Sequence, residues 1–192
     1  TGSLDFKQAT PTTFPPADAR LKLDDFTRTS ITTVSQPVDI ELVGRLEADG
    51  GHASALVSRR GAAIGRMLLD LKPLPSGAGD WMTRLLAAPL TGGVRYNGPA
   101  GALFSLAALP DQSLSGTIGV AADFSGHVQA PRLTGVVRAN DLTYDNGQYG
   151  TKLTNMQVQG RFTNDRLNVE KLTARAGDGT VSTSGYVSLS AS

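Results

Sequence analysis

The sequence predicts a mainly β protein, an antiparallel meander that curls into a U-shaped gutter with an apolar interior and one or two short helices. From Leu114 onward, apolar residues occupy alternate positions, the period of a half-buried strand. Turn residues such as Asp145-Asn146-Gly147 separate these runs. Glycine recurs on the apolar side of the runs, where it favours a sharp bend. These glycines are Gly116, Gly135, Gly160 and Gly185.

The first 79 residues carry a weaker strand pattern. Residues 1–18 are expected to be a lead-in, in which Thr1 to Ser3 resembles a cloning remnant and Thr10 to Pro16 is rich in Pro and Thr. Residues 19–79 are expected to supply the N-terminal strands of the gutter. Asp49-Gly50-Gly51 marks a turn between two of these strands.

Residues 80–110 are predicted to be an insertion with two short helices. Asp80 is a suitable N-cap for a helix from Trp81 to about Ala88, which Pro89 ends. Pro99 suits the first position of a second helix that extends through Ala108. Two short helices therefore interrupt the expected sheet.

Residues 111–192 are predicted to form a C-terminal gutter repeat. The alternation slips by one residue near Asn140-Asp141 and again at Lys171-Leu172. Each slip predicts a β-bulge, because an uncorrected slip would reverse the facing of every later side chain. A strand pattern is still running at the last residues, so we expect one continuous fragment of a longer protein.

A sheet with one apolar face needs a cover. Five strands about 4.8 Å apart and about 20 Å long present roughly 500 Å² of apolar face. Leaving that area in water forgoes on the order of 12 kcal/mol, so the sheet is expected to fold over on itself. The pattern alone allows a self-filled sandwich or barrel. It also allows a curled sheet whose aliphatic interior holds an acyl chain, and the low aromatic content, 6%, favours this second form.

The side chains expected to line such a groove share one face of the predicted strands. They are Leu114, Ile118, Val120, Phe124, Leu133, Val137, Met156, Val158, Phe162, Leu167, Val169, Leu172, Val181, Val187 and Leu189.

The uncharged stretch from Gly98 to Pro110 has two interpretations. Its helix either packs against the sheet or plugs an open end of the groove. The candidate plug residues are Leu103, Phe104, Leu106 and Leu109.

Several other classes of function lack their sequence signatures. Eighteen basic residues balance 17 acidic ones without a basic cluster in the sequence, which argues against nucleic-acid binding. The chain has no Cys, and His52 and His127 stand in turn-like surroundings without a set of metal ligands. It also has no P-loop, dinucleotide fingerprint or nucleophile elbow. We therefore expect a non-enzymatic protein with no catalytic residues, metal or cofactor.

An ordered series of short phrases in the C-terminal half resembles a known family. The series runs from Leu114-Ser115-Gly116 through Pro131-Arg132-Leu133-Thr134-Gly135 to Ala176-Gly177-Asp178-Gly179, and it ends on Gly185. It is similar to the TamB family, the translocation and assembly module proteins of Gram-negative envelopes. The likeness covers residues 80–190 fairly well and the first 80 residues weakly.

The resemblance implies a long periplasmic protein of a Gram-negative bacterium, anchored in the inner membrane by a segment outside this chain. It implies a β-taco groove that carries phospholipid between the membranes and supports outer-membrane biogenesis. The implied partners are phospholipid and, through the full-length protein, TamA or another Omp85-type barrel.

Two functions of other classes stay open beside lipid transport. One is a chaperone-like scaffold that binds outer-membrane protein strands by β-augmentation. The other is a structural β-repeat of a surface or autotransporter passenger. Unpaired sheet edges would also permit an edge-to-edge dimer.

Overall fold

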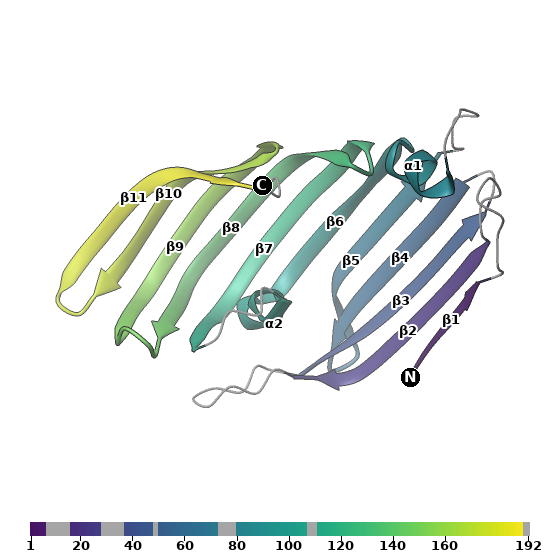
Figure 1. Ribbon diagram of the computed structural model, residues 1–192. Coiled ribbons are helices and arrows are strands. Elements are labelled where there is room, and N and C mark those ends of the chain that lie inside the picture. Colours follow the sequence, from purple (N-terminus) through teal and green to yellow (C-terminus); the bar gives the residue numbers. More distant parts are fainter. Residues whose placement is uncertain (7–15, 28–36, 48–49, 73–79, 107–110, 190–192) are drawn as a thin grey trace.

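The computed structural model describes residues 1–6, 16–27, 37–47, 50–72, 80–106 and 111–189 of the 192-residue chain. One antiparallel sheet of eleven strands dominates it, and the strands stand in sequence order from β1 at one edge to β11 at the other (Figure 1). The two edge strands do not pair with each other, so the sheet is open rather than closed. The prediction of a mainly β antiparallel meander is confirmed.

The longest strands lie at the start of the C-terminal half. The first five strands are β1 (Gly2–Phe6), β2 (Ala17–Phe26), β3 (Val38–Glu47), β4 (Gly50–Arg59) and β5 (Ala62–Leu71). The middle of the chain forms α1 (Trp81–Leu86), β6 (Leu90–Pro99) and α2 (Ala100–Leu106). The last five strands are β7 (Gln112–His127), β8 (Ala130–Asn146), β9 (Thr151–Asn164), β10 (Arg166–Ala176) and β11 (Gly179–Ser188).

Two strands lie where the sequence analysis expected none. β1 occupies part of the expected lead-in, 1–18, and pairs with β2 from Gly2 to Phe6. β6 lies inside the expected helical insertion, 80–110, and bridges the two halves of the sheet. Both predicted helices are present: α1 ends at Leu86, before the expected end near Ala88, and α2 begins at Ala100 because Pro99 closes β6 instead of opening the helix. The predicted end of α2 at Ala108 lies outside the described residues.

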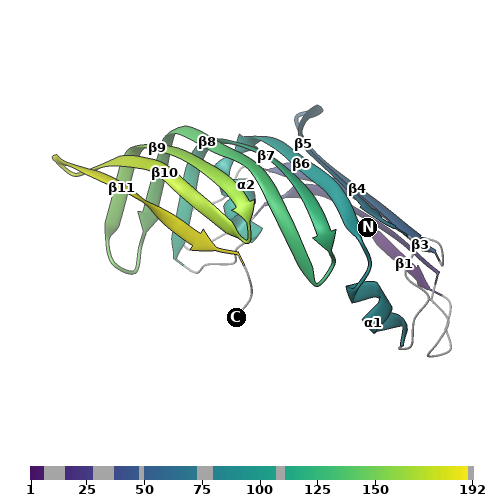
Figure 2. The same ribbon diagram turned by 90° about the horizontal axis from the view of Figure 1, so that it is seen from above.

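The sheet is curved. Seen from above, β7 to β10 arch, and α2 lies inside the arc (Figure 2). The two helices stand at opposite ends of β6, the strand that joins them (Figure 1). The side of the sheet that carries the helices is called the concave face below, and the other side the convex face. The predicted curled gutter matches this shape.

The concave face is apolar across the sheet from β2 to β11. One row of cross-strand partners shows this continuity, and its members come from ten successive strands. They are Leu21, Leu42, Ala55, Met67, Val94, Ala122, Gly135, Phe162, Leu167 and Val187. Because neighbouring strands keep their apolar residues in register, the face is a single surface.

Register shifts keep the apolar residues on this face. The β8–β9 ladder shifts between Ala139 and Leu142, and the β10–β11 ladder shifts between Val169 and Leu172. Both places are those where the sequence pattern slips, so the two predicted bulges are confirmed. Asp141, within the first shift, has the left-handed φ of 60°, which Asp adopts more readily than most residues. Leu142 therefore pairs with Met156 on the concave face.

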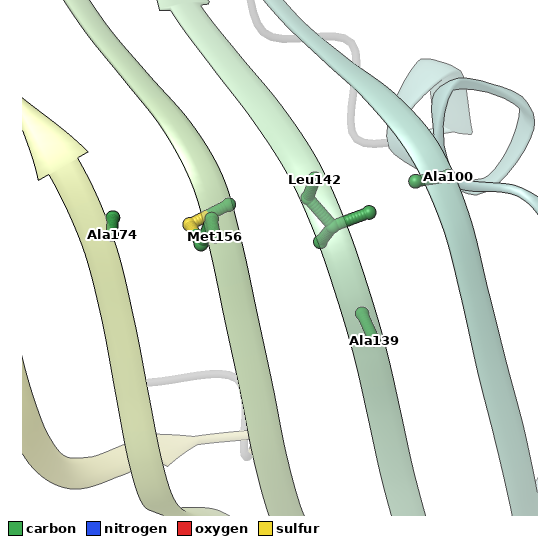
Figure 3. Packing of buried hydrophobic residues seen from close by; sticks show 5 residues of the cluster. All are labelled: Ala100, Ala139, Leu142, Met156 and Ala174. Carbon is green, nitrogen blue, oxygen red and sulfur yellow. The ribbon is translucent and has the colours of Figure 1, made fainter.

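A small core lies where α2 meets the concave face. Ala100, Ala139, Leu142, Met156 and Ala174 form a buried cluster along neighbouring strands (Figure 3). The ring of Phe104 meets that of Tyr144 edge to face, with centroids 6.5 Å apart. The first interpretation of the uncharged stretch, a helix that packs against the sheet, matches these contacts.

Most of the concave face has no second layer among the described residues. Every strand belongs to one sheet. The two helices cover only the parts of the face that lie near the two ends of β6. The chain accordingly exposes 11996 Å² of surface. A compact monomer of this mass would expose roughly 8,700 Å².

Gly135 marks a place where two backbones approach closely. A Cβ at Gly135 would overlap the carbonyl oxygen of Ala121, whereas a Cβ at Gly185 on β11 would meet nothing within 4 Å. Gly135→Ala should therefore lower the free energy of unfolding by about 1–3 kcal/mol. Gly185→Ala, the matched control, should leave it nearly unchanged. Urea unfolding of both variants checks this, and equal midpoints would contradict the close approach.

Candidate functional site

The concave face is the candidate site because its side chains differ in kind from those of the convex face. Ion pairs between neighbouring strands lie on the convex face, with side chains at least half exposed. They join Arg45 to Asp18 at 3.5 Å, Arg95 to Asp123 at 2.7 Å and Arg161 to Glu170 at 3.1 Å. Such exposed pairs contribute little to stability. Because these charged side chains lie on the convex face, the row of cross-strand partners on the concave face stays apolar.

An apolar pocket lies where α1 approaches the concave face. Its volume is 370 Å³, within the range of about 300–1,000 Å³ that is usual for small-molecule sites. Leu85 of α1 and Val128 of the β7–β8 turn stand over strands β2 to β6. The strand residues that line the pocket are Ala17, Ala19, Gly44, Arg45, Leu46, Gly51, His52, Ala53, Leu69, Leu71 and Leu90.

Both ends of α1 are held in place. At its start, the Asp80 carboxylate accepts a hydrogen bond from the Thr83 N–H at 2.8 Å, and hydrogen bonding by Thr83 lowers the pKa of Asp80. At its end, the Gln129 N–H donates to the Leu86 carbonyl at 3.0 Å and the Val128 N–H to the Ala88 carbonyl at 3.1 Å. The β7–β8 turn thus satisfies carbonyls that a helix end leaves free, and Leu85 is held over the pocket.

The ring of Tyr96 lies near the centre of the concave face, on the sixth of the eleven strands. It is 5% exposed, and its ring covers two glycines: a Cβ at Gly65 would lie 2.7 Å from its Cδ2, and one at Gly98 would lie 3.0 Å from its hydroxyl. The hydroxyl donates to the Pro99 carbonyl at 2.8 Å. Burial raises the pKa of Tyr96 to about 12. The phenol is therefore neutral at physiological pH, and its one donor is satisfied.

The predicted lining residues divide into three groups along the concave face. Five of them form or contact the core cluster near α2: Leu114, Ile118, Met156, Val158 and Leu172. Seven lie in the arch of β7 to β10 outside that cluster: Val120, Phe124, Leu133, Val137, Phe162, Leu167 and Val169. The last three, on or just after β11, are more open: Val181 is 39% exposed, Val187 53% and Leu189 43%.

The four candidate plug residues do not form one observable group. Leu103 and Phe104 are half-buried on α2. The placement of the Leu106 side chain and of Leu109 lies outside the described residues. α2 lies over the end of the concave face at which the core cluster forms.

Sequence reasoning missed the pocket under α1. Its residues come from the N-terminal strands, where alternation was visible at Leu69 and Leu71, and from Leu90 of the unexpected strand β6. The alternation of Leu90, Val94 and Tyr96 was a signal that could have revealed β6. No local pattern indicated that Leu85 and Val128 would meet over those strands.

In the part of the chain that the structure describes, no group of three or more His, Asp or Glu residues is placed to hold a metal ion. No helix within that part is long and apolar enough to cross a membrane. No protein-family model, curated protein or solved structure matches the chain. The fold class is therefore established by the strand pairing alone.

The raised pKa of Tyr96 has a measurable consequence. Because the pKa of the folded state, about 12, exceeds the ordinary value near 10, the stability linked to this phenol is complete below pH 10. That stability is then lost as the pH rises toward 12. Ultraviolet titration of tyrosinate should show a component near pH 12 that Tyr96→Phe removes. Loss of a component near pH 10 instead would contradict burial of the phenol.

Proposed function

We propose that this chain is a non-enzymatic segment of a lipid-transfer protein, and that its concave face accommodates the acyl chains of phospholipids. The observation that carries this proposal is the apolar row that continues across ten strands, with no second sheet over it in the described part of the chain. An acyl chain laid along that row gains about 0.8 kcal/mol for each methylene that leaves water. A surface of this kind suits an extended apolar ligand better than a compact one.

The pocket under α1 supports the same proposal. Its lining is almost wholly aliphatic, and it opens on strands that also belong to the continuous row. A chain lying in the groove would therefore find partial enclosure at this end, and contact from a single side elsewhere. Enclosure on more sides removes more methylene surface from water, so the pocket is the expected position of tightest acyl contact.

The proposal includes the setting that the resemblance to the TamB family implies. In that setting the parent protein lies in the periplasm of a Gram-negative bacterium and is anchored in the inner membrane. It then works with TamA or another Omp85-type barrel in outer-membrane biogenesis. The groove supports only the lipid part of this proposal. The partner and the compartment rest on the resemblance.

Adjacent residues of β5 provide a matched test of acyl-chain binding. Leu69 lines the pocket, whereas Leu68 points to the convex face and is 54% exposed. Leu69→Glu should lower binding of a fluorescent fatty acid at least about tenfold, because an unpaired carboxylate is costly in an apolar pocket. Leu68→Glu should bind as the unchanged protein does. Equal binding by both variants would rule out this pocket, with circular dichroism as the check that each one folds.

A second function, capture of an extended strand by β-augmentation, is favoured by the exposed edge at β11. Every residue of β11 is exposed, and none of them is charged. Natural sheets usually protect an edge with charge, Pro or a bulge. An incoming strand with alternating apolar residues would extend the concave row beyond Val187.

Ser184→Lys tests this second function, because a charge on an edge strand disfavours pairing. The variant should weaken binding of a labelled peptide of alternating Val and Thr, followed by fluorescence anisotropy. Ser54→Lys, on the internal strand β4, is the control and should not affect binding. If both variants bind the peptide as the unchanged protein does, β11 is not the docking edge.

A further inference from the structure

The convex face contains a hollow around which three arginine side chains gather. Arg66 comes from β5, Arg95 from β6 and Arg138 from β8, and all three line a hollow of 500 Å³. These residues are far apart in the sequence, which shows no basic cluster. The fold brings them together. We call this feature the arginine hollow.

Small residues of β7 form the floor of the arginine hollow. Across the strands, Arg95 pairs with Ala121 and Ala121 with Val136, while Asn97 pairs with Gly119 and Gly119 with Arg138. Strands β6 and β8 are two strand spacings, about 9.6 Å, apart. Longer side chains on both therefore stand on either side of a floor made of Gly119 and Ala121.

The arginines of the hollow are unequally neutralised. Arg95 is fixed by its partners: Nη2 donates to Asp123 Oδ1 at 2.7 Å, and Nη1 donates to the Ala122 carbonyl at 2.9 Å. Arg66 lies directly opposite Arg95 in the ladder, an arrangement of like charges that is unfavourable on a sheet. Within the described residues, the side chains of Arg66 and Arg138 have neither an ion pair nor a hydrogen bond. Arg95 is thus the one arginine of the three that has a carboxylate partner in the described part of the chain.

We propose that the arginine hollow binds a phosphate group carried by a small organic moiety. Guanidinium groups offer paired donors that match phosphate oxygens, and an anion between Arg66 and Arg95 would offset their repulsion. The apolar atoms of Ala121 and Val136 provide a surface for the organic part. The hollow lies on the convex face, so this proposal does not depend on acyl binding in the groove.

Glycerol 3-phosphate is the soluble probe, and glycerol is its uncharged counterpart. Each compound is titrated into the folded chain and followed by backbone amide NMR. Glycerol 3-phosphate should shift the signals of Gly119 and Ala121, and glycerol should not. Arg66→Gln and Arg138→Gln should each weaken binding about tenfold, because each removes charge-assisted hydrogen bonds. Arg132→Gln is the matched control. It removes the same charge from β8 on the convex face, outside the hollow.

Two further measurements separate shape from charge and identify the source of the phosphate. Ala121→Leu should block the floor and abolish binding without any change in charge. Vesicles of phosphatidylcholine with and without phosphatidylglycerol then test a lipid headgroup as the source. Binding of glycerol 3-phosphate supports a soluble ligand, and hollow-dependent binding of phosphatidylglycerol vesicles alone supports a headgroup. Binding of neither probe, or an equal loss with Arg132→Gln, overturns the proposal.

Discussion

The structure depends on one hydrophobic constraint: the apolar face of a wide sheet must be removed from water as far as possible. In the described part of the chain, two short helices are the only elements that cover this face. Most domains meet this requirement with a second sheet or a layer of helices. Here the cross-strand pairs, the curvature of β7 to β10 and the core cluster near α2 supply partial burial. Many apolar side chains of β2 to β10 consequently stay half-buried rather than buried. A face in this condition stabilises the sheet less than a closed core would, but it leaves surface to which a ligand can bind.

Bulges and glycines connect this constraint to the arch. The register shifts in β8 and β10 would turn apolar residues outward if each were not matched by a slip in the sequence pattern. Gly135 permits the backbones of β7 and β8 to approach more closely than any side chain would allow. Tyr96 compensates for the space above Gly65 and Gly98 by covering both. Strand curvature and apolar continuity therefore come from the same positions.

Much of the fold could be predicted because the information was local. Period-two alternation identified the C-terminal strands, slips in it located both bulges, and Asp80 with Pro89 located α1. β6 was missed because two helix signals flank it and glycines interrupt its apolar side at Gly92 and Gly98. Two features of the sites depend on residues distant in sequence: Leu85 and Val128 line the same pocket, and Arg66 and Arg138 line the same hollow. Sequence periodicity does not predict which distant residues lie near each other, because that depends on how the strands pair in the sheet.

The strict sequence order of the strands makes this molecule close to one-dimensional. Each strand pairs only with its neighbours in the sequence, so folding can spread outward from a stable hairpin. Gain or loss of one hairpin would change the span by about 9.6 Å and leave the remaining ladder intact. Duplication of hairpins can therefore change the length of the sheet in steps of one hairpin.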